Sequence, residues 1–144
     1  MQKTEMSDTG MRRDVRAHSV VRQNKELDLG LWILQVFLGL VFIAVGGSKL
    51  FDTAPAVEMF KKIGVGQMLR YLIGTIEVFG AITLWNPRYS SLGALLLAIT
   101  MSGVIFMHLF VIGGSPIVSF VLLILLSIVI WGRRDEIKQI FNIK

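Results

Sequence analysis

The chain has 144 residues, about the length of a single domain, but its composition argues against both a soluble fold and disorder. Hydrophobic residues make up 53% of it and charged residues 17%, whereas soluble domains average about a quarter charged. The net charge of +5 resembles that of a nucleic-acid binder. However, the basic residues flank apolar segments, as they do in membrane proteins, so we expect a lipid bilayer and no nucleic acid as partner.

The chain contains no cysteine and only two histidines, His18 and His108. Disulfides, iron–sulfur clusters, thiolate zinc sites and covalent haem attachment are therefore excluded, and a bis-histidine haem within one chain is not expected. We expect no metal site, no catalytic residues and no intrinsic cofactor. The pattern favours a protein that is not a stand-alone enzyme, although this point stays open.

Residues 1–29 form a polar tail that we expect to be mobile or to lie on the cytoplasmic membrane surface. A membrane domain over residues 30–132 follows. Its four apolar segments, at about 31–50, 68–85, 92–113 and 115–131, reach the roughly 17–20 residues that cross a bilayer core. Turn residues at 86–88 and 113–116 connect neighbouring spans. The sequence predicts an all-α fold, an integral membrane four-helix bundle with a long extracytoplasmic first loop.

Two further helices are predicted outside the spans. In the loop 51–67, Pro55 marks a helix start and Gly64 its end, so a short helix should lie over that side of the bundle. Residues 133–144 place Ile137, Ile140 and Phe141 on one face. This spacing predicts an amphipathic helix at the cytoplasmic surface.

The basic residues define an orientation. Eleven Lys and Arg fall in the two terminal segments and the 85–91 turn, and four fall on the other side. The positive-inside rule therefore places both termini in the cytoplasm of a multi-pass protein of the plasma (inner) membrane. The tryptophans Trp32, Trp85 and Trp131 lie at the cytoplasmic ends of the spans, as an aromatic belt requires.

Glu77 is the most informative residue, because a carboxylate within a span costs at least ~2.5 kcal/mol and needs a partner or a function. It lies on a stripe of small and polar residues, Arg70, Gly74, Glu77 and Ala81, and the first span has a matching stripe, Gly39, Phe42, Gly46 and Lys49. Such stripes face other helices. We expect Lys49 and Glu77 to interact, either as a buried polar pocket open to the outside or as an ion pair that only fixes helix register.

His108 falls at a similar depth in the third span and is a candidate third member of this pocket. Against this, its face is turned about 120° from the small-residue stripe of its own helix at 3.6 residues per turn. A lone histidine is more often a packing residue. Arg70 is expected to anchor at the lipid headgroups and not to enter the pocket.

Two short patterns carry a family resemblance: Gly-x-x-Lys-Leu over residues 46–50 and Glu-x-x-Gly-Ala-x-x-Leu over residues 77–84. In this order, with a long first loop between them, they resemble the DoxX/DoxX-like family over residues 31–131. The resemblance implies a small membrane subunit associated with quinone-linked oxidoreductases or oxidative-stress complexes. It also implies that Lys49 and Glu77 occupy the charged positions of the family.

Three functions are compatible with the sequence. The first is an accessory subunit or anchor of a quinone-linked or oxidative-stress redox system, which would contact redox-complex subunits and possess a site for quinone. The second is a non-enzymatic assembly or scaffold protein whose buried charges only fix the fold. The third, a small-solute or proton transporter, is disfavoured because the sequence shows neither an internal repeat nor broken helices. The sequence leaves oligomeric state open.

The orientation gives a direct prediction. A reporter that is active only outside the cytoplasm should be silent when fused after Lys144, and active when inserted between Lys62 and Gly66, because the basic imbalance places these sites on opposite sides. Reporter activity of the two fusions in intact cells checks this. Strong activity of the Lys144 fusion would reverse the orientation.

Overall fold

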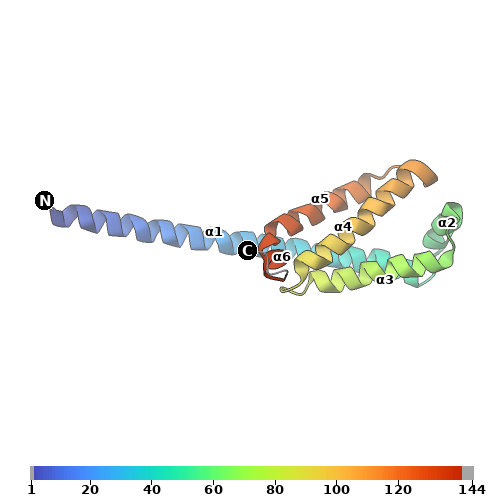
Figure 1. Ribbon diagram of the computed structural model, residues 1–144, viewed down its shortest axis with the longest axis horizontal. Helices are drawn as coiled ribbons and strands as arrows, with labels where there is room; N and C mark the ends of the chain where they lie inside the picture. The colour runs from blue at the N-terminus through green and yellow to red at the C-terminus, as the bar shows by residue number, and fades with distance from the viewer. Residues whose placement is uncertain (1, 141–144) are drawn as a thin grey trace. The chain divides into compact units, whose positions relative to one another are not determined.

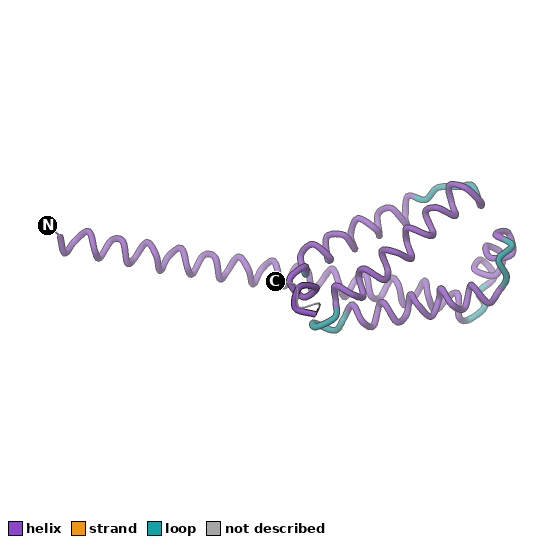
Figure 2. Tube along the Cα trace, viewed as in Figure 1, coloured by secondary structure: helices purple, strands orange, loops and turns teal. Residues whose placement is uncertain are grey.

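The computed structural model describes the backbone of residues 2–140 and the side chains of residues 25–135, 137 and 138. Within this range every regular element is a helix, and the helices are joined by short loops (Figure 2). The elements are α1 (Gln2–Leu50), α2 (Ala54–Ile63), α3 (Gln67–Leu84), α4 (Ser90–Met107), the π-helix η1 (His108–Ile112), α5 (Ile117–Gly132) and α6 (Arg134–Ile140). The predicted all-α class therefore holds for the described residues.

The chain divides into two units, Met1–Ile33 and Leu34–Lys144. The first unit is a single helix, the N-terminal part of α1, which begins at Gln2. The first span is expected to start at residue 31. At this residue the composition changes from polar to apolar, but the helix does not begin there. The second unit contains the rest of α1 and all other elements. The side chains of Ile140 and Phe141, expected on the apolar face of the C-terminal helix, lie outside the described residues.

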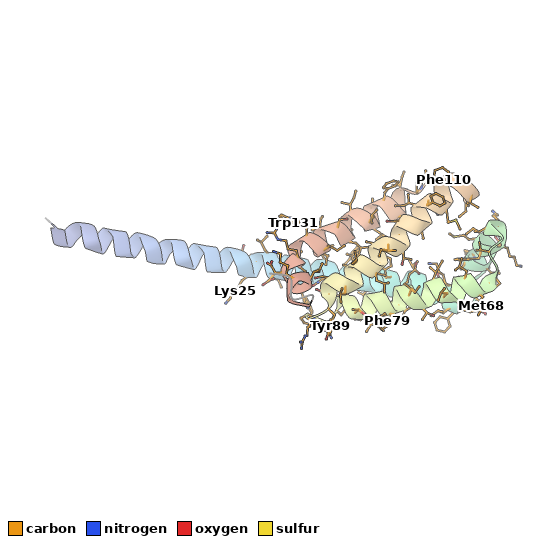
Figure 3. All side chains as sticks on the ribbon, viewed as in Figure 1. Lys25, Met68, Phe79, Tyr89, Phe110 and Trp131 are labelled. Atoms are coloured by element: carbon orange, nitrogen blue, oxygen red, sulfur yellow. The ribbon has the colours of Figure 1, made fainter. Side chains whose placement is uncertain are left out.

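Within the described part of the chain, two stretches are long and apolar enough to cross a membrane, Lys25–Leu50 and Ser90–Ile112. Helix α5 is also apolar but shorter, and α3 has 18 residues including Arg70 and Glu77. Large apolar side chains cover the outside of the second unit, and Figure 3 shows Phe79, Phe110 and Trp131 pointing away from the helices. Exposed apolar surface of this extent marks a membrane or protein contact.

Helix α2 occupies the segment for which the sequence predicts a short helix. Pro55 stands in its first turn, where a missing backbone N–H costs nothing. Gly64 ends it in the left-handed conformation, with φ of 75°, and donates its N–H to the carbonyls of Phe60 and Lys61. Phe60 is 3% exposed, so the apolar face of α2 packs against the rest of the second unit.

Glycines let α3 approach its two neighbours at different heights. A methyl group at Gly46 of α1 would stand 2.9 Å from the carbonyl oxygen of Gly74 in α3, and the reverse distance is the same. A methyl group at Gly93 of α4 would stand 2.6 Å from the backbone nitrogen of Leu84, at the other end of α3. Such contacts between backbones are possible only without a Cβ. Helices α1 and α3 are thus in contact nearer α2, and α3 and α4 are in contact nearer α6.

The hydrophobic core fills the part of the second unit nearest α6, called here the α6 end. Buried side chains of four helices meet there: Leu38 and Phe42, Ala81 and Leu84, Ala94 and Leu97, and Leu126 and Val129. Toward the opposite end, where α2 lies (the α2 end), α4 and α5 diverge from α3 (Figure 1).

The close approach of α1 and α3 can be tested with two alanine substitutions. Gly46→Ala should lower the free energy of unfolding of the detergent-solubilised protein by about 1–3 kcal/mol. The reason is that the new Cβ meets a backbone oxygen that cannot move aside. Gly103→Ala is the control, because nothing lies within 4 Å of a Cβ there and alanine favours a helix. Equal stability of the two variants would contradict the packing.

Candidate functional site

A buried ion pair joins α1 to α3. The Lys49 ammonium, in the last turn of α1, donates to both carboxylate oxygens of Glu77 in α3, at 2.6 Å to Oε2 and 2.9 Å to Oε1. Glu77 is fully buried and Lys49 is 8% exposed. The neighbouring stripe residues Gly46 and Gly74 are buried as well. The two charges therefore meet where the glycines allow the backbones of α1 and α3 to come together.

Arg70 lies next to this pair but does not line the same space. It is 2% exposed, and its guanidinium donates to the backbone carbonyl of Lys49, to the Asp52 carboxylate and, at 2.7 Å, to Gln67 Oε1. The expectation that Arg70 anchors at lipid headgroups is wrong. The physical reason is that α1 ends at Leu50 and leaves carbonyls without helical partners, and Arg70 satisfies one of them.

Asp52 completes this cluster in the turn between α1 and α2. It adopts a left-handed conformation with φ of 54° and accepts a hydrogen bond of 2.6 Å from the Tyr71 hydroxyl. The hydrogen bonds from Tyr71 and then Arg70 hold the pKa of the Asp52 carboxyl below its ordinary value. Asp52 is therefore a carboxylate at neutral pH, and it ties the start of the α2 loop to α3.

A cavity of about 740 Å³ opens at the α2 end of the second unit. Its walls come from α1, α2, α3, α4, η1 and α5 and are mainly apolar, with the side chains of Met59, Phe60, Ile73, Ile76, Met101 and Val104 among them. The polar side chains on its walls are Lys49, Glu77, Thr100, His108, Ser115 and Ser119. All three residues that the sequence analysis names as a candidate pocket, Lys49, Glu77 and His108, thus line one cavity.

His108 enters the cavity on a different side from the ion pair. It is the first residue of the π-helix η1, and its Nδ1 is buried with no hydrogen-bond partner among the described residues. On α4, Ala94 and Ala98 are buried in the core at the α6 end. The cavity wall on α4 begins directly after Ala98, at Ile99, and continues through Met107 to His108.

Only some of the other residues that line the cavity could be predicted from the sequence. The helical spacing of Phe60 and Ile63 predicts α2, whose apolar face forms one wall. Ser115 and Ser119 carry no signal, because hydroxyls in an apolar segment usually bond to the backbone of their own helix. Cavities of about 300–1,000 Å³ with apolar walls and a few polar groups are typical of small-molecule sites.

These features define an all-helical membrane protein with an apolar internal cavity. The sequence profile of the DoxX-like family matches residues 33–131, and the chain belongs to this family. Among curated proteins, the chain is similar to "Putative oxidoreductase CatD" of Bacillus subtilis (strain 168), with 28% identity over 82 residues. The match covers 57% of this chain and 61% of that relative's length. No solved structure matches the chain.

The ion pair gives a prediction that separates coupled from independent charges. Glu77→Gln and Lys49→Met should each destabilise the protein by about 3–5 kcal/mol, because each leaves a buried charge without its partner. The double variant should lose less than either single variant. Thermal unfolding of the four proteins in one detergent checks this, and losses that simply add would show that the two residues are not coupled.

Proposed function

We propose that this protein is an accessory subunit or anchor of a membrane redox system, linked to quinone or to the oxidative-stress response. The observation that carries the proposal is the apolar cavity into which the Lys49–Glu77 pair and His108 open. It is supported by membership of the DoxX-like family and by the similarity to a protein whose name describes an oxidoreductase. The protein itself would bind the quinone or the partner protein and hold it in position, and the partner would transfer the electrons.

The cavity fits a lipid-soluble carrier such as a quinone. Its volume of about 740 Å³ is sufficient for a ring with part of a chain, and its apolar walls suit such a molecule. His108 lines the cavity, and an imidazole nitrogen can donate to or accept from an oxygen of such a ring. When bound, a quinone would supply two-electron redox chemistry, for which a chain without cysteine has no iron–sulfur or thiol group of its own.

The proposal includes a membrane arrangement. We propose four spans, formed by the membrane part of α1 and by α3, α4 with η1, and α5, with both termini in the cytoplasm of the plasma (inner) membrane. Two of these meet the length and hydropathy of a span on their own. Helix α3 carries two charged residues, but Arg70 and Glu77 both have partners within the protein, which lowers the cost of burying them. In this arrangement the α2 end faces outward.

A scaffold function is the alternative, and the contacts around Lys49 favour it. Its ammonium bonds to Glu77 and its carbonyl to Arg70, so one residue of α1 is held by two of α3. An ion pair held this firmly can fix the register of two helices with no ligand at all. In this case the partner is another protein and the cavity has no part in the function.

Purification of the full chain from its own membrane in a mild detergent distinguishes the accessory-subunit function from the scaffold function. Proteins and lipid-soluble molecules that co-purify are identified by mass spectrometry. A redox protein in fixed stoichiometry together with quinone supports the accessory-subunit function. A stoichiometric non-redox partner without quinone supports the scaffold, and a chain that carries neither redox protein nor quinone would contradict the first proposal.

A further inference from the structure

One polar side chain of the cavity wall has no hydrogen-bond partner and can still be reached by a ligand. Ser119 of α5 lines the cavity and is 9% exposed. Its hydroxyl forms no hydrogen bond with any described residue, yet its oxygen is not among the unpartnered atoms that have lost all accessible surface. The Nδ1 of His108 has lost it. A nearly buried polar group without a partner costs free energy that a ligand can recover, and here that group is Ser119.

The position of Ser119 at the start of α5 explains why its hydroxyl is free. Hydroxyls elsewhere in the described helices donate to the carbonyl four residues earlier, as in Thr75, Thr83, Thr100, Ser102 and Ser127. Helix α5 begins at Ile117, so the residue four positions before Ser119 precedes the helix. The nearer carbonyl, that of Pro116, accepts the N–H of Phe120 at 3.0 Å. The usual backbone acceptor is therefore missing for a geometric reason.

The same turn of α5 supplies further hydrogen-bond donors. The backbone N–H groups of Ile117, Val118 and Ser119 have no partner among the described residues, and no side chain caps this end of the helix. Unpaired N–H groups give the N-terminus of a helix a partial positive charge, which favours an electron-rich oxygen. The first turn of α5 thus suits a ligand atom that accepts hydrogen bonds.

The charges on the cavity walls favour a neutral acceptor over an anionic one. The ammonium of Lys49 donates to both carboxylate oxygens of Glu77, and no other lysine and no arginine is among the described residues that line the cavity. A carboxylate in this space would have no unneutralised lysine or arginine, and an unpaired anion in apolar surroundings is far more costly than a neutral polar group. A carbonyl needs only a donor, and the mainly apolar walls suit an apolar body attached to it.

We infer that Ser119 donates a hydrogen bond to a carbonyl oxygen of an uncharged, lipid-soluble compound held in the cavity. This inference deepens the proposed function and rests on its cavity. An oxidised quinone has such carbonyl groups, whereas a fatty acid at neutral pH presents a carboxylate. Ser119 is thus a binding residue, and it acts without a partner protein because the hydroxyl and the cavity belong to the same chain.

The binding test compares two serines of the same helix. The full chain is placed in lipid nanodiscs with a benzoquinone that carries a ten-carbon chain, and binding is followed as the rise in melting temperature with probe concentration. Ser119→Ala should raise the half-saturating concentration about three- to tenfold, the effect of one hydrogen bond, and Ser119→Thr should restore binding. Ser127→Ala is the control and should have no effect, because Ser127 bonds to the Leu123 carbonyl and does not line the cavity.

Infrared spectroscopy separates a direct contact from an indirect change. A hydrogen bond weakens the C=O bond and lowers its stretching frequency, and carbon-13 in the probe's carbonyl groups distinguishes them from the protein. One carbonyl band of the bound probe should move to higher frequency in Ser119→Ala and return in Ser119→Thr. Without the probe, Ser119→Ala should melt at the same temperature as the unaltered protein or above it, because the substitution removes no hydrogen bond to a described residue.

The inference is overturned if Ser119→Ala binds the probe as the unaltered chain does, if Ser127→Ala weakens binding equally, or if the carbonyl band does not move. Tighter saturable binding of ionised decanoate than of the benzoquinone would refute the neutral carbonyl. A probe-free Ser119→Ala that melts well below the unaltered chain would show that the hydroxyl already has a partner. The absence of saturable binding to any of the proteins would refute the site.

These results are distinguishable from a failure of the proposed function. If a redox partner co-purifies, the accessory-subunit function stands even when the probe does not bind. Conversely, binding of the probe through Ser119 without any redox partner would refute only the accessory-subunit function.

Discussion

The ion pair between Lys49 and Glu77 is the interaction on which the rest of the second unit depends. A carboxylate with no exposed surface cannot remain charged in an apolar bundle without a cation in direct contact. Lys49 can supply it only if the end of α1 lies against the middle of α3, and Gly46 and Gly74 permit this approach because neither has a Cβ. Arg70 then caps the end of α1 and holds Asp52, so the position of the loop that carries α2 follows from the same contact.

The same constraint explains why the cavity is located where it is. Helix α3 is bound to α1 by charge and by glycine contact toward α2, and to α4 by glycine contact toward α6. Helix α1 also stays against α3 at the α6 end, where Trp85 donates to the carbonyl of Gln35. Core side chains such as Leu97 fill the α6 end, whereas at the α2 end α4 and α5 diverge from α3 (Figure 1) and the cavity lies between the helices. Methionines line this space, and their flexible side chains adapt to an irregular volume.

Much of this was predictable from the sequence, and what was not predictable has identifiable causes. A charged residue in an apolar segment is conspicuous, and helical spacing alone places Glu77 and Lys49 on facing stripes. The capping residues Pro55 and Gly64 locate α2. Arg70 was misplaced because its partner is a backbone carbonyl, and a carbonyl has no signature in the sequence. The cavity wall around His108 depends on how α4 is placed against α3 and α5, and this tertiary arrangement cannot be derived from the sequence of α4 alone. That these residues form a functional pocket stays a prediction.

The structural and functional interpretations of the ion pair are compatible for a physical reason. A lysine ammonium has three donors, and Glu77 uses two of them, so the pair is neutral as a whole and still has one N–H to offer. A neutral pair borders an apolar cavity at far lower cost than a single charge would, because no net charge is removed from water. It can therefore fix α1 against α3 permanently while its surface toward the cavity stays available. His108 lines the cavity from a different element, the π-helix η1, and π-helical turns are frequent at functional sites. If the proposed ligand binds at the His108 side of the cavity, it contacts η1 and leaves the contact between α1 and α3 undisturbed.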